Sequence, residues 1–290
     1  MPSRPNQRAP TRPRQKKRCG GRRTIATLQR FVRARWRTFR AAKKTVLASP
    51  PTLRIVVVLA TILLCLLGVN WAYHAVNKPT EILFLLDHSL NKNPAETWKQ
   101  YGSLFREHAT SVMRPELLAA LAQVESGGNP VARTYWRWHL TWNPLELYQP
   151  ASSAVGMYQI TDGTFHEATR YCIHDHRVIE NGPWNDPNSC WFNGLYSRVV
   201  PSHAIQLTSA LLDRRVVGAV APRRIGAVTL RQKQDLAAVI HLCGAGAGHA
   251  YAARGFRLSP HQRCGDHDVR HYLVRVNAMT YRFVRLAAAS

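Results

Sequence analysis

The sequence predicts a mostly α-helical domain behind a single N-terminal transmembrane helix. Three observations support this prediction: an uncharged apolar stretch over residues 55–77, a basic segment before it, and apolar residues at helical spacing after it. The chain has 290 residues and carries 40 Lys and Arg against 16 Asp and Glu, a formal net charge of +24. Residues 1–54 hold 17 of these basic residues and no acid, which argues against a protein that coats nucleic acid evenly.

Residues 55–77 form the predicted transmembrane anchor. As a helix, these 23 residues would span about 35 Å, enough to cross a hydrocarbon core of about 30 Å. Trp71 and Tyr73 lie near its far end, where aromatic rings favour the membrane interface. The alternatives are a buried core helix and a cleaved signal peptide. A basic region of 54 residues and the lack of a good cleavage site disfavour the signal peptide.

The basic tail, residues 1–54, predicts the orientation of the anchor. Positive charge remains in the cytoplasm, so residues 78–290 are expected on the other side of the membrane. From Thr24 onward, apolar residues recur between arginines and predict a basic amphipathic helix that ends before Pro50. This helix either lies on the anionic inner leaflet or is a solvated flank that only sets the orientation. A tail that binds nucleic acid is the less favoured alternative.

Beyond the anchor, the sequence predicts a linker over residues 78–92 and a helical domain over 93–290. Asn93 and Pro94 are typical of a helix start. Pro115 opens a second, largely apolar helix, which the glycines at 127 and 128 end. Strand-like alternation is scarce. Further helices are predicted over residues 163–172, 202–221, 232–243 and 266–287.

Four cysteines in the exported region predict two disulfides, if the compartment is oxidising. The favoured pairs are Cys172–Cys190 and Cys243–Cys264, because each closes a short local loop. The spacing of Cys264, His267 and His271 would also suit zinc, with Cys243 as a fourth ligand. Export favours the disulfides, so no metal site is predicted.

Glu125 is the residue with catalytic character. It lies at the C-terminal end of the apolar helix that Pro115 opens. Partial burial and the negative end of the helix dipole are both expected to raise the pKa of its carboxyl. A carboxylic acid that keeps its proton near neutral pH can act as a general acid. The alternative is a solvated glutamate at a helix end.

Four motifs occur in the chain in a fixed order: ESGGNP at 125–130, SAVGMYQIT at 153–161, CGAG at 243–246 and DVRHYL at 268–273. Together they resemble the motifs of lytic transglycosylases of the soluble-type (SLT), goose-lysozyme-like superfamily. The resemblance covers roughly residues 111–279. It implies a lysozyme-like catalytic domain in the periplasm, behind a single-pass anchor in a bacterial inner membrane.

The resemblance also implies an activity, which is cleavage of peptidoglycan glycan strands between N-acetylmuramic acid and N-acetylglucosamine. Glu125 would act as general acid and then as base, helping the muramic acid 6-hydroxyl close a 1,6-anhydro ring. No cofactor is implied. Gln159 would bind sugar amides, Met157 or Tyr158 would line the cleft, and Asp268 and Tyr272 would orient the acid and bind sugar. Ser126 of the first motif is a further candidate for substrate binding.

Two departures from the family pattern concern the site. Cys243 and Gly244 stand where the family has Tyr-Asn, which removes a hydroxyl that usually contacts the catalytic carboxyl; a disulfide at Cys243 could hold this turn instead. In the second motif, Met157-Tyr158 replaces Leu-Met. The long interval before Gln159 predicts an inserted loop over residues 134–148. Its tryptophans, Trp136, Trp138 and Trp142, either stack on sugars or pack the loop onto the core.

Three alternatives to the lytic activity remain open. A hydrolytic muramidase would need a second carboxylate, for which the candidates are Glu146, Asp162 and Asp175. A non-catalytic module could bind glycan as a scaffold. A nucleic-acid-binding membrane protein would act through the tail and weaken steeply with salt, but no nucleic-acid partner is expected. The topology suggests local wall cutting, for which an envelope-spanning secretion or conjugation apparatus is one setting.

Overall fold

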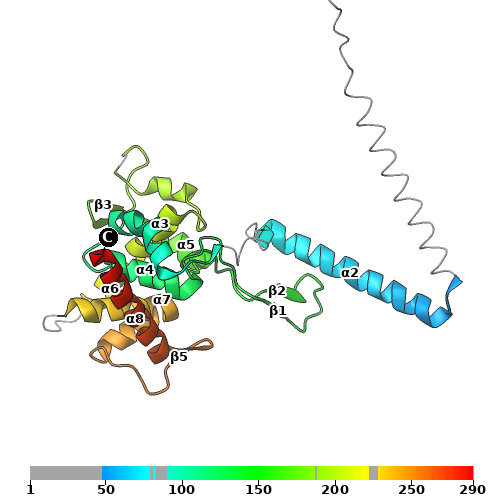
Figure 1. Ribbon diagram of the computed structural model, residues 1–290. Coiled ribbons are helices and arrows are strands. Elements are labelled where there is room, and N and C mark those ends of the chain that lie inside the picture. Colours follow the sequence, from blue (N-terminus) through cyan, green and yellow to red (C-terminus); the bar gives the residue numbers. More distant parts are fainter. Residues whose placement is uncertain (1–47, 79–80, 83–89, 187, 222–227, 290) are drawn as a thin grey trace, which may run out of the picture. The chain divides into compact units, whose positions relative to one another are not determined.

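The computed structural model describes residues 48–78, 81–82, 90–186, 188–221 and 228–289 (Figure 1). The chain divides into two compact units, Met1–Leu66 and Leu67–Ser290, and the second contains the helical domain. The amphipathic helix predicted in the tail falls outside the described residues. Within the described residues the structure is mainly helical, which confirms the predicted fold class.

Helix α2, Pro51–Asn77, contains the predicted anchor. It begins four residues before the uncharged stretch, because a proline in the first helical turn needs no backbone hydrogen-bond donor. Its most apolar part has no buried residues, so leucine, isoleucine and valine side chains cover its surface. Helix α7, Leu230–Ala253, is also long and apolar enough to cross a membrane, but it buries Leu236–Ile240 in the domain core.

The core of the domain forms around α4, Pro115–Ser126, which packs against α3, Pro94–Glu107. Both helices begin where the sequence predicts. Asn93 caps α3 through a reciprocal capping box with Glu96. Residues 117–122 of α4 are completely or almost completely buried. A helix that is apolar all round must be enclosed by neighbours, and α3 and α8, Val269–Ala288, provide this enclosure.

Two further helices, α5, Asp162–Ala168, and α6, Pro201–Val220, complete the domain, and α6 packs against α7. Helix α5 is shorter than the predicted helix over 163–172, because the chain turns into a strand at Tyr171. Helix α7 is longer than predicted and is interrupted at Gly244, whose φ of 81° and ψ of 172° are not helical. This interruption falls within the third motif.

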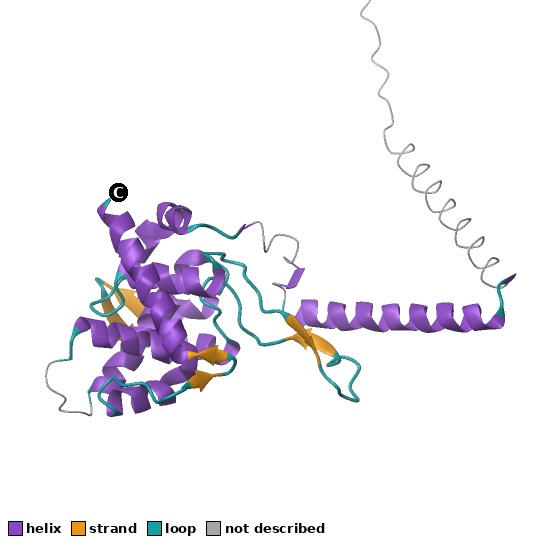
Figure 2. Ribbon diagram, turned by 60° about the horizontal axis from the view of Figure 1, so that its bottom comes forward, coloured by secondary structure: helices purple, strands orange, loops and turns teal. Residues whose placement is uncertain are grey.

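In the described part of the chain, three antiparallel hairpins supplement the helices. Figure 2 draws their strands in orange. Their strand pairs are β1, Trp136–Trp138, with β2, Tyr148–Pro150; β3, Tyr171–His174, with β4, Arg177–Glu180; and β5, Arg263–Cys264, with β6, His267–Asp268. A short 3-10 helix, η3, spans Trp191–Leu195. The insertion predicted over 134–148 is therefore largely the β1–β2 hairpin.

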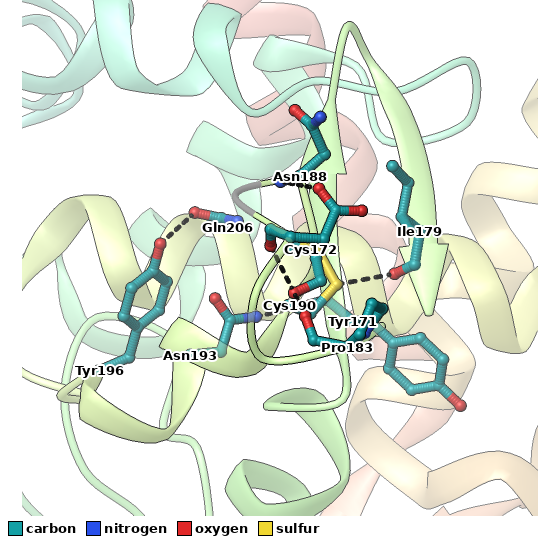
Figure 3. The surroundings of a disulfide bond; sticks show 11 residues. Tyr171, Cys172, Ile179, Pro183, Asn188, Cys190, Asn193, Tyr196 and Gln206 are labelled. Atoms are coloured by element: carbon teal, nitrogen blue, oxygen red, sulfur yellow. Dashed lines mark hydrogen bonds between the residues drawn. A yellow bond between two sulfur atoms is a disulfide. The ribbon is translucent and has the colours of Figure 1, made fainter. Parts of the chain in front are cut away.

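Both favoured disulfides are present, which confirms the predicted pairing. Cys172 of β3 is joined to Cys190 with a Cα–Cα distance of 5.3 Å, and Cys243 is joined to Cys264 with 5.4 Å. Beside the first disulfide, the Asn193 amide donates to the Tyr171 carbonyl at 2.6 Å (Figure 3). Because Cys243 and Cys264 are bonded to each other, neither offers a free thiolate to the alternative zinc site.

A buried ionic cluster lies just beyond α2 and consists of Lys78, Glu81, Arg133 and Trp136. The Glu81 side chain has no exposed surface. Its two oxygens lie 3.1 Å from Lys78 Nζ and 3.0 Å from Arg133 Nη1, and the Trp136 indole N–H donates to Oε2 at 2.8 Å. This cluster therefore connects the chain after α2 to the start of the β1–β2 hairpin.

Candidate active site

Glu125 lies in the last turn of α4, where the core holds the helix and a glycine ends it. Gly127 takes a left-handed conformation with φ of 62°, so the chain leaves the helix directly after Ser126. The Glu125 side chain is 17% exposed. The carboxyl group therefore lies at the edge of the core, with enough surface to meet a substrate.

Tyr272 of α8 contacts the Glu125 carboxyl directly. Its hydroxyl donates to Glu125 Oε1 at 2.5 Å. Burial raises the pKa of Tyr272 well above its ordinary value, and the Glu125 charge and hydrogen bond raise it further. The phenol therefore remains a neutral donor at physiological pH. The structure thus brings together Glu125 and Tyr272, two residues 147 positions apart that the sequence analysis placed in one site.

Asp268 is the N-cap of α8. Its carboxylate accepts a hydrogen bond from the His271 backbone N–H at 2.8 Å. A capping residue fixes where a helix begins, and Tyr272 follows one turn later on the same helix. Asp268 therefore helps to position Tyr272 by fixing the start of α8. Its exposed side chain, together with Arg270, also borders a surface pocket.

His241 is a partner of Glu125 that the sequence motifs do not predict. Its Nε2 lies 3.5 Å from Glu125 Oε1. It belongs to α7, two residues before Cys243 and therefore just upstream of the third motif. The available signal was a lone titratable residue in an apolar helical stretch. From just upstream of the third motif, His241 brings an imidazole to the carboxyl.

The pKa of Glu125 is lowered, which corrects the expectation that it is raised. Burial does act to raise it and is the largest single influence. The hydrogen-bonding and charge of His241, the hydrogen bond from Tyr272 and the charge of His267 act in the opposite direction and together outweigh burial. The expectation considered burial and the helix dipole, but not the partners that two other segments bring to the carboxyl.

The Cys243–Cys264 disulfide connects the two segments that carry these partners. Cys243 follows His241 on α7, and Cys264 lies in β5, ahead of the helix that carries Tyr272. Gly244 interrupts α7 next to the bridge, with a φ that favours glycine. The disulfide thus ties together the chain segments that hold the phenol and the imidazole around Glu125.

The turn of the second motif packs against the end of α4. Ser126 Oγ donates to the Met157 carbonyl at 2.9 Å, so its hydroxyl holds this turn to the helix. Met157 and Tyr158 have no exposed surface, and the Tyr158 hydroxyl donates to the Leu118 carbonyl. This burial corrects the expectation that these two side chains line the cleft, because an unexposed side chain has no surface to offer a glycan.

Gln159 follows in the left-handed region, with φ of 49°. Its amide nitrogen donates to the carbonyls of Ala132 and Gly156, at 3.2 and 3.0 Å. It lines a cavity of about 260 Å³ together with His241. Since the amide N–H group bonds to the protein, the carbonyl oxygen of Gln159 is the atom that could accept a hydrogen bond from a ligand.

None of the three candidate second carboxylates contacts Glu125. Asp162 pairs with Arg198 at 2.7 Å, and Glu146 accepts a hydrogen bond from Asn143. Asp175 occupies the turn between β3 and β4 with φ of 47°. Among the described residues, the side chains that bond to or pair with the Glu125 carboxyl are a phenol and an imidazole, and neither is a carboxylate.

The comparison with protein families identifies the domain. Residues 103–188 match the family described as Transglycosylase SLT domain, and this range contains Glu125 and the second motif. His241 and Tyr272 lie beyond it. No curated protein matches the chain. The match confirms the resemblance noted in the sequence, and a peptidoglycan-directed function follows from it. The chain therefore contains a transglycosylase domain of the SLT type, in the lysozyme-like superfamily.

Proposed function

We propose that this protein is a membrane-anchored lytic transglycosylase that cleaves peptidoglycan between N-acetylmuramic acid and N-acetylglucosamine. The observation that carries the proposal is the Glu125 carboxyl, which lies at the edge of the core within reach of the Tyr272 hydroxyl and the His241 imidazole. Glu125 lies within the range that matches the SLT family, residues 103–188. A carboxyl between two proton-bearing partners is suited to both acid and base catalysis.

In the first step, protonated Glu125 gives its proton to the glycosidic oxygen, and the bond from this oxygen to the muramic acid C1 breaks. The N-acetylglucosamine portion leaves as an alcohol, while the substrate's own acetamido group assists at C1. Glu125, now a carboxylate, then removes the proton from the muramic acid 6-hydroxyl as that oxygen bonds to C1. The proton balance closes, no water is consumed, and the product carries a 1,6-anhydro ring.

Because the pKa of Glu125 is lowered, its carboxyl is mostly ionised in the free site. To act as a general acid, Glu125 must first gain a proton. A bound glycan would exclude water and favour the neutral carboxyl. Tyr272 and His241 both approach Oε1, and no hydrogen bond from the described residues reaches Oε2. Oε2 is therefore the oxygen we assign to proton transfer. Oε1 keeps the carboxyl in position.

Anchoring in the membrane rests on α2. Its exposed side chains are almost entirely apolar over a length that matches a bilayer, and lipid is the solvent in which such a surface is stable. The basic residues before it favour a cytoplasmic tail and a periplasmic domain. Anchoring would confine cutting to wall close to the membrane, next to a protein complex that requires a local opening.

The test is digestion of purified sacculi by the detergent-solubilised full chain, followed by mass spectrometry of the soluble products. We expect 1,6-anhydromuramyl ends from the wild type and at least a hundredfold less product from Glu125→Gln. Glu116→Gln, at the other end of α4, is the matched control and should retain activity. Reducing muramic acid ends would contradict the lytic reaction and indicate a hydrolase. Sacculus binding without products would indicate a scaffold.

A further inference from the structure

The β1–β2 hairpin carries an uncharged tip with unusual exposure. Residues 138–145 contain no acidic or basic residue apart from His139. Trp138 is 66% exposed, and Leu140 and Trp142 are fully exposed. Large apolar side chains gathered on one loop are unfavourable in water and mark a surface that binds something apolar. These exposures also exclude the expectation that Trp138 and Trp142 pack the loop onto the core.

The loop is held against the last turns of α2. Asn70 Nδ2 donates to the Pro144 carbonyl at 3.1 Å, and His74 Nε2 lies 2.8 Å from the Leu145 carbonyl. Asn70 is almost completely buried, although most of α2 is exposed. Asn70 and His74 are four residues apart and share one face of the helix, so the loop covers this face.

The contacts continue along the base of the hairpin. The His74 ring meets the Trp136 ring edge to face at 5.5 Å. Lys78 Nζ donates to the carbonyls of Ser152 and Ala154, both at 3.2 Å. Together with the ion pairs of Glu81, these contacts fix the hairpin to the end of α2 at several heights. These contacts place the hairpin next to the end of α2.

Helix geometry gives the depth of these contacts. Asn70 follows Arg54, the last charged residue before the apolar stretch, by 16 residues, which is about 24 Å along a helix. His74 lies about 30 Å from Arg54, the thickness of a bilayer core. The exposed rings of Trp71 and Tyr73 fall in the same interval. The hairpin thus joins α2 at the level where its hydrocarbon-spanning part ends.

We infer that Trp138, Leu140 and Trp142 insert into the boundary between headgroups and acyl chains of the leaflet on the catalytic side of the membrane. With Trp71 and Tyr73 they form one aromatic belt, built from two segments far apart in the sequence. Indole rings favour this boundary because they combine an apolar face with a polar N–H group. The inference rests on the membrane anchoring proposed above and is independent of the catalytic assignment.

The experiment uses the full chain in phospholipid vesicles with a nitroxide label at a single cysteine. In a Cys19→Ser background, a label on Cys65, which is free and lies in the apolar part of α2, reports the anchor itself. In a Cys19→Ser/Cys65→Ser background, Leu140→Cys reports the hairpin tip. Leu195→Cys in the same background is the matched control, because it replaces another largely exposed leucine, in η3. Collisions of each label with oxygen and with a water-soluble nickel chelate measure its depth.

We expect labels at 65 and 140 to collide mainly with oxygen, with 140 nearer the surface than 65, and the label at 195 to collide mainly with nickel. A deep label at 65 with an aqueous label at 140 would overturn the inference and leave the anchor intact. An aqueous label at 65 would overturn both. If glycan fragments immobilise an aqueous label at 140, the tip binds sugar, and the lipid assignment is wrong.

Discussion

Glu125 and Glu81 are both shielded carboxyls with two or more partners, but their partners differ in kind. Glu81 lies between the basic side chains of Lys78 and Arg133, and it receives the Trp136 N–H. Glu125 lies between a phenol and an imidazole. Two basic side chains and an indole N–H stabilise the ionised form of Glu81, whereas Glu125 is held at Oε1 and receives no hydrogen bond at Oε2 from the described residues. The difference separates a structural carboxylate from one suited to proton transfer.

The largest expected effect on stability comes from the Glu81→Gln substitution. Removing one charge from a buried ionic cluster leaves its basic partners uncompensated, at a cost of about 3–5 kcal/mol. We expect the amides of the β1–β2 hairpin to lose protection in hydrogen exchange, while cleavage of small soluble glycans stays within about twofold. Glu180→Gln is the matched control, since Glu180 also pairs with two arginines but on the surface. It should cost less than about 1 kcal/mol.

The next prediction distinguishes the two disulfides by the effect that removing each has on Tm and on kcat. Each closes a loop of similar length, with sequence separations of 18 and 21 residues, so each should contribute about 3 kcal/mol to the free energy of unfolding. Breaking either pair with Cys→Ser should lower Tm by roughly 6–12 °C in calorimetry. Below both transitions, only loss of Cys243–Cys264 should lower kcat, because this bridge ties the His241 and Tyr272 segments together. Equal losses of kcat would contradict a positioning role.

Tyr272→Phe should have a smaller effect, because it removes one hydrogen bond to the carboxyl and keeps the packed ring. A hydrogen bond to a charged group is worth about 1.5–3 kcal/mol, so kcat/KM should fall about 10- to 150-fold. The same change should raise the pKa of Glu125 and alter the pH profile. Tyr251→Phe, another buried tyrosine, serves as the control. Unchanged kinetics in Tyr272→Phe would remove this residue from the site.

His241→Asn should give the smallest loss, less than about tenfold in kcat at the pH optimum. Its effect is on pH dependence. His241 helps lower the pKa of Glu125, so the protonated acid of the wild type is depleted as pH rises through a value below the ordinary one. Without the histidine, the falling limb of the kcat/KM profile should move to higher pH. His249→Asn, exposed on the same helix, should leave the profile unchanged; an identical profile for His241→Asn would exclude the coupling.

The starts of helices α3 and α4 are predictable from the sequence because their signals are local. Asn93 with Pro94, and Pro115 with Gly127, mark helix ends through backbone chemistry that does not depend on the rest of the fold. The β3–β4 hairpin was not predicted because its turn is Asp175-His176, with both residues at positive φ. Such a turn is usually signalled by Asn-Gly or Asp-Gly.

The site residues that lie in sequence motifs were predicted, and the site residue that only the fold brings to Glu125 was not. Glu125 and Tyr272 each stand in a recognisable motif, and their hydrogen bond matches the expectation. His241 lies outside the four motifs, and it contacts the carboxyl only because the fold brings this part of α7 to the end of α4. Met157 and Tyr158 turned out to be buried because a tight turn presents some residues inward, and the order of letters does not say which.

The way α4 is bounded has a consequence for how this protein can change over time. Its start at Pro115 and its left-handed end at Gly127 fix the number of residues before Glu125. Adding or removing one residue would turn the carboxyl about 100° around the helix and shift it by about 1.5 Å, away from Tyr272 and His241. Insertions and deletions are therefore expected to accumulate in segments such as the hairpin tip. Within α4, variation should be limited to substitutions that conserve length.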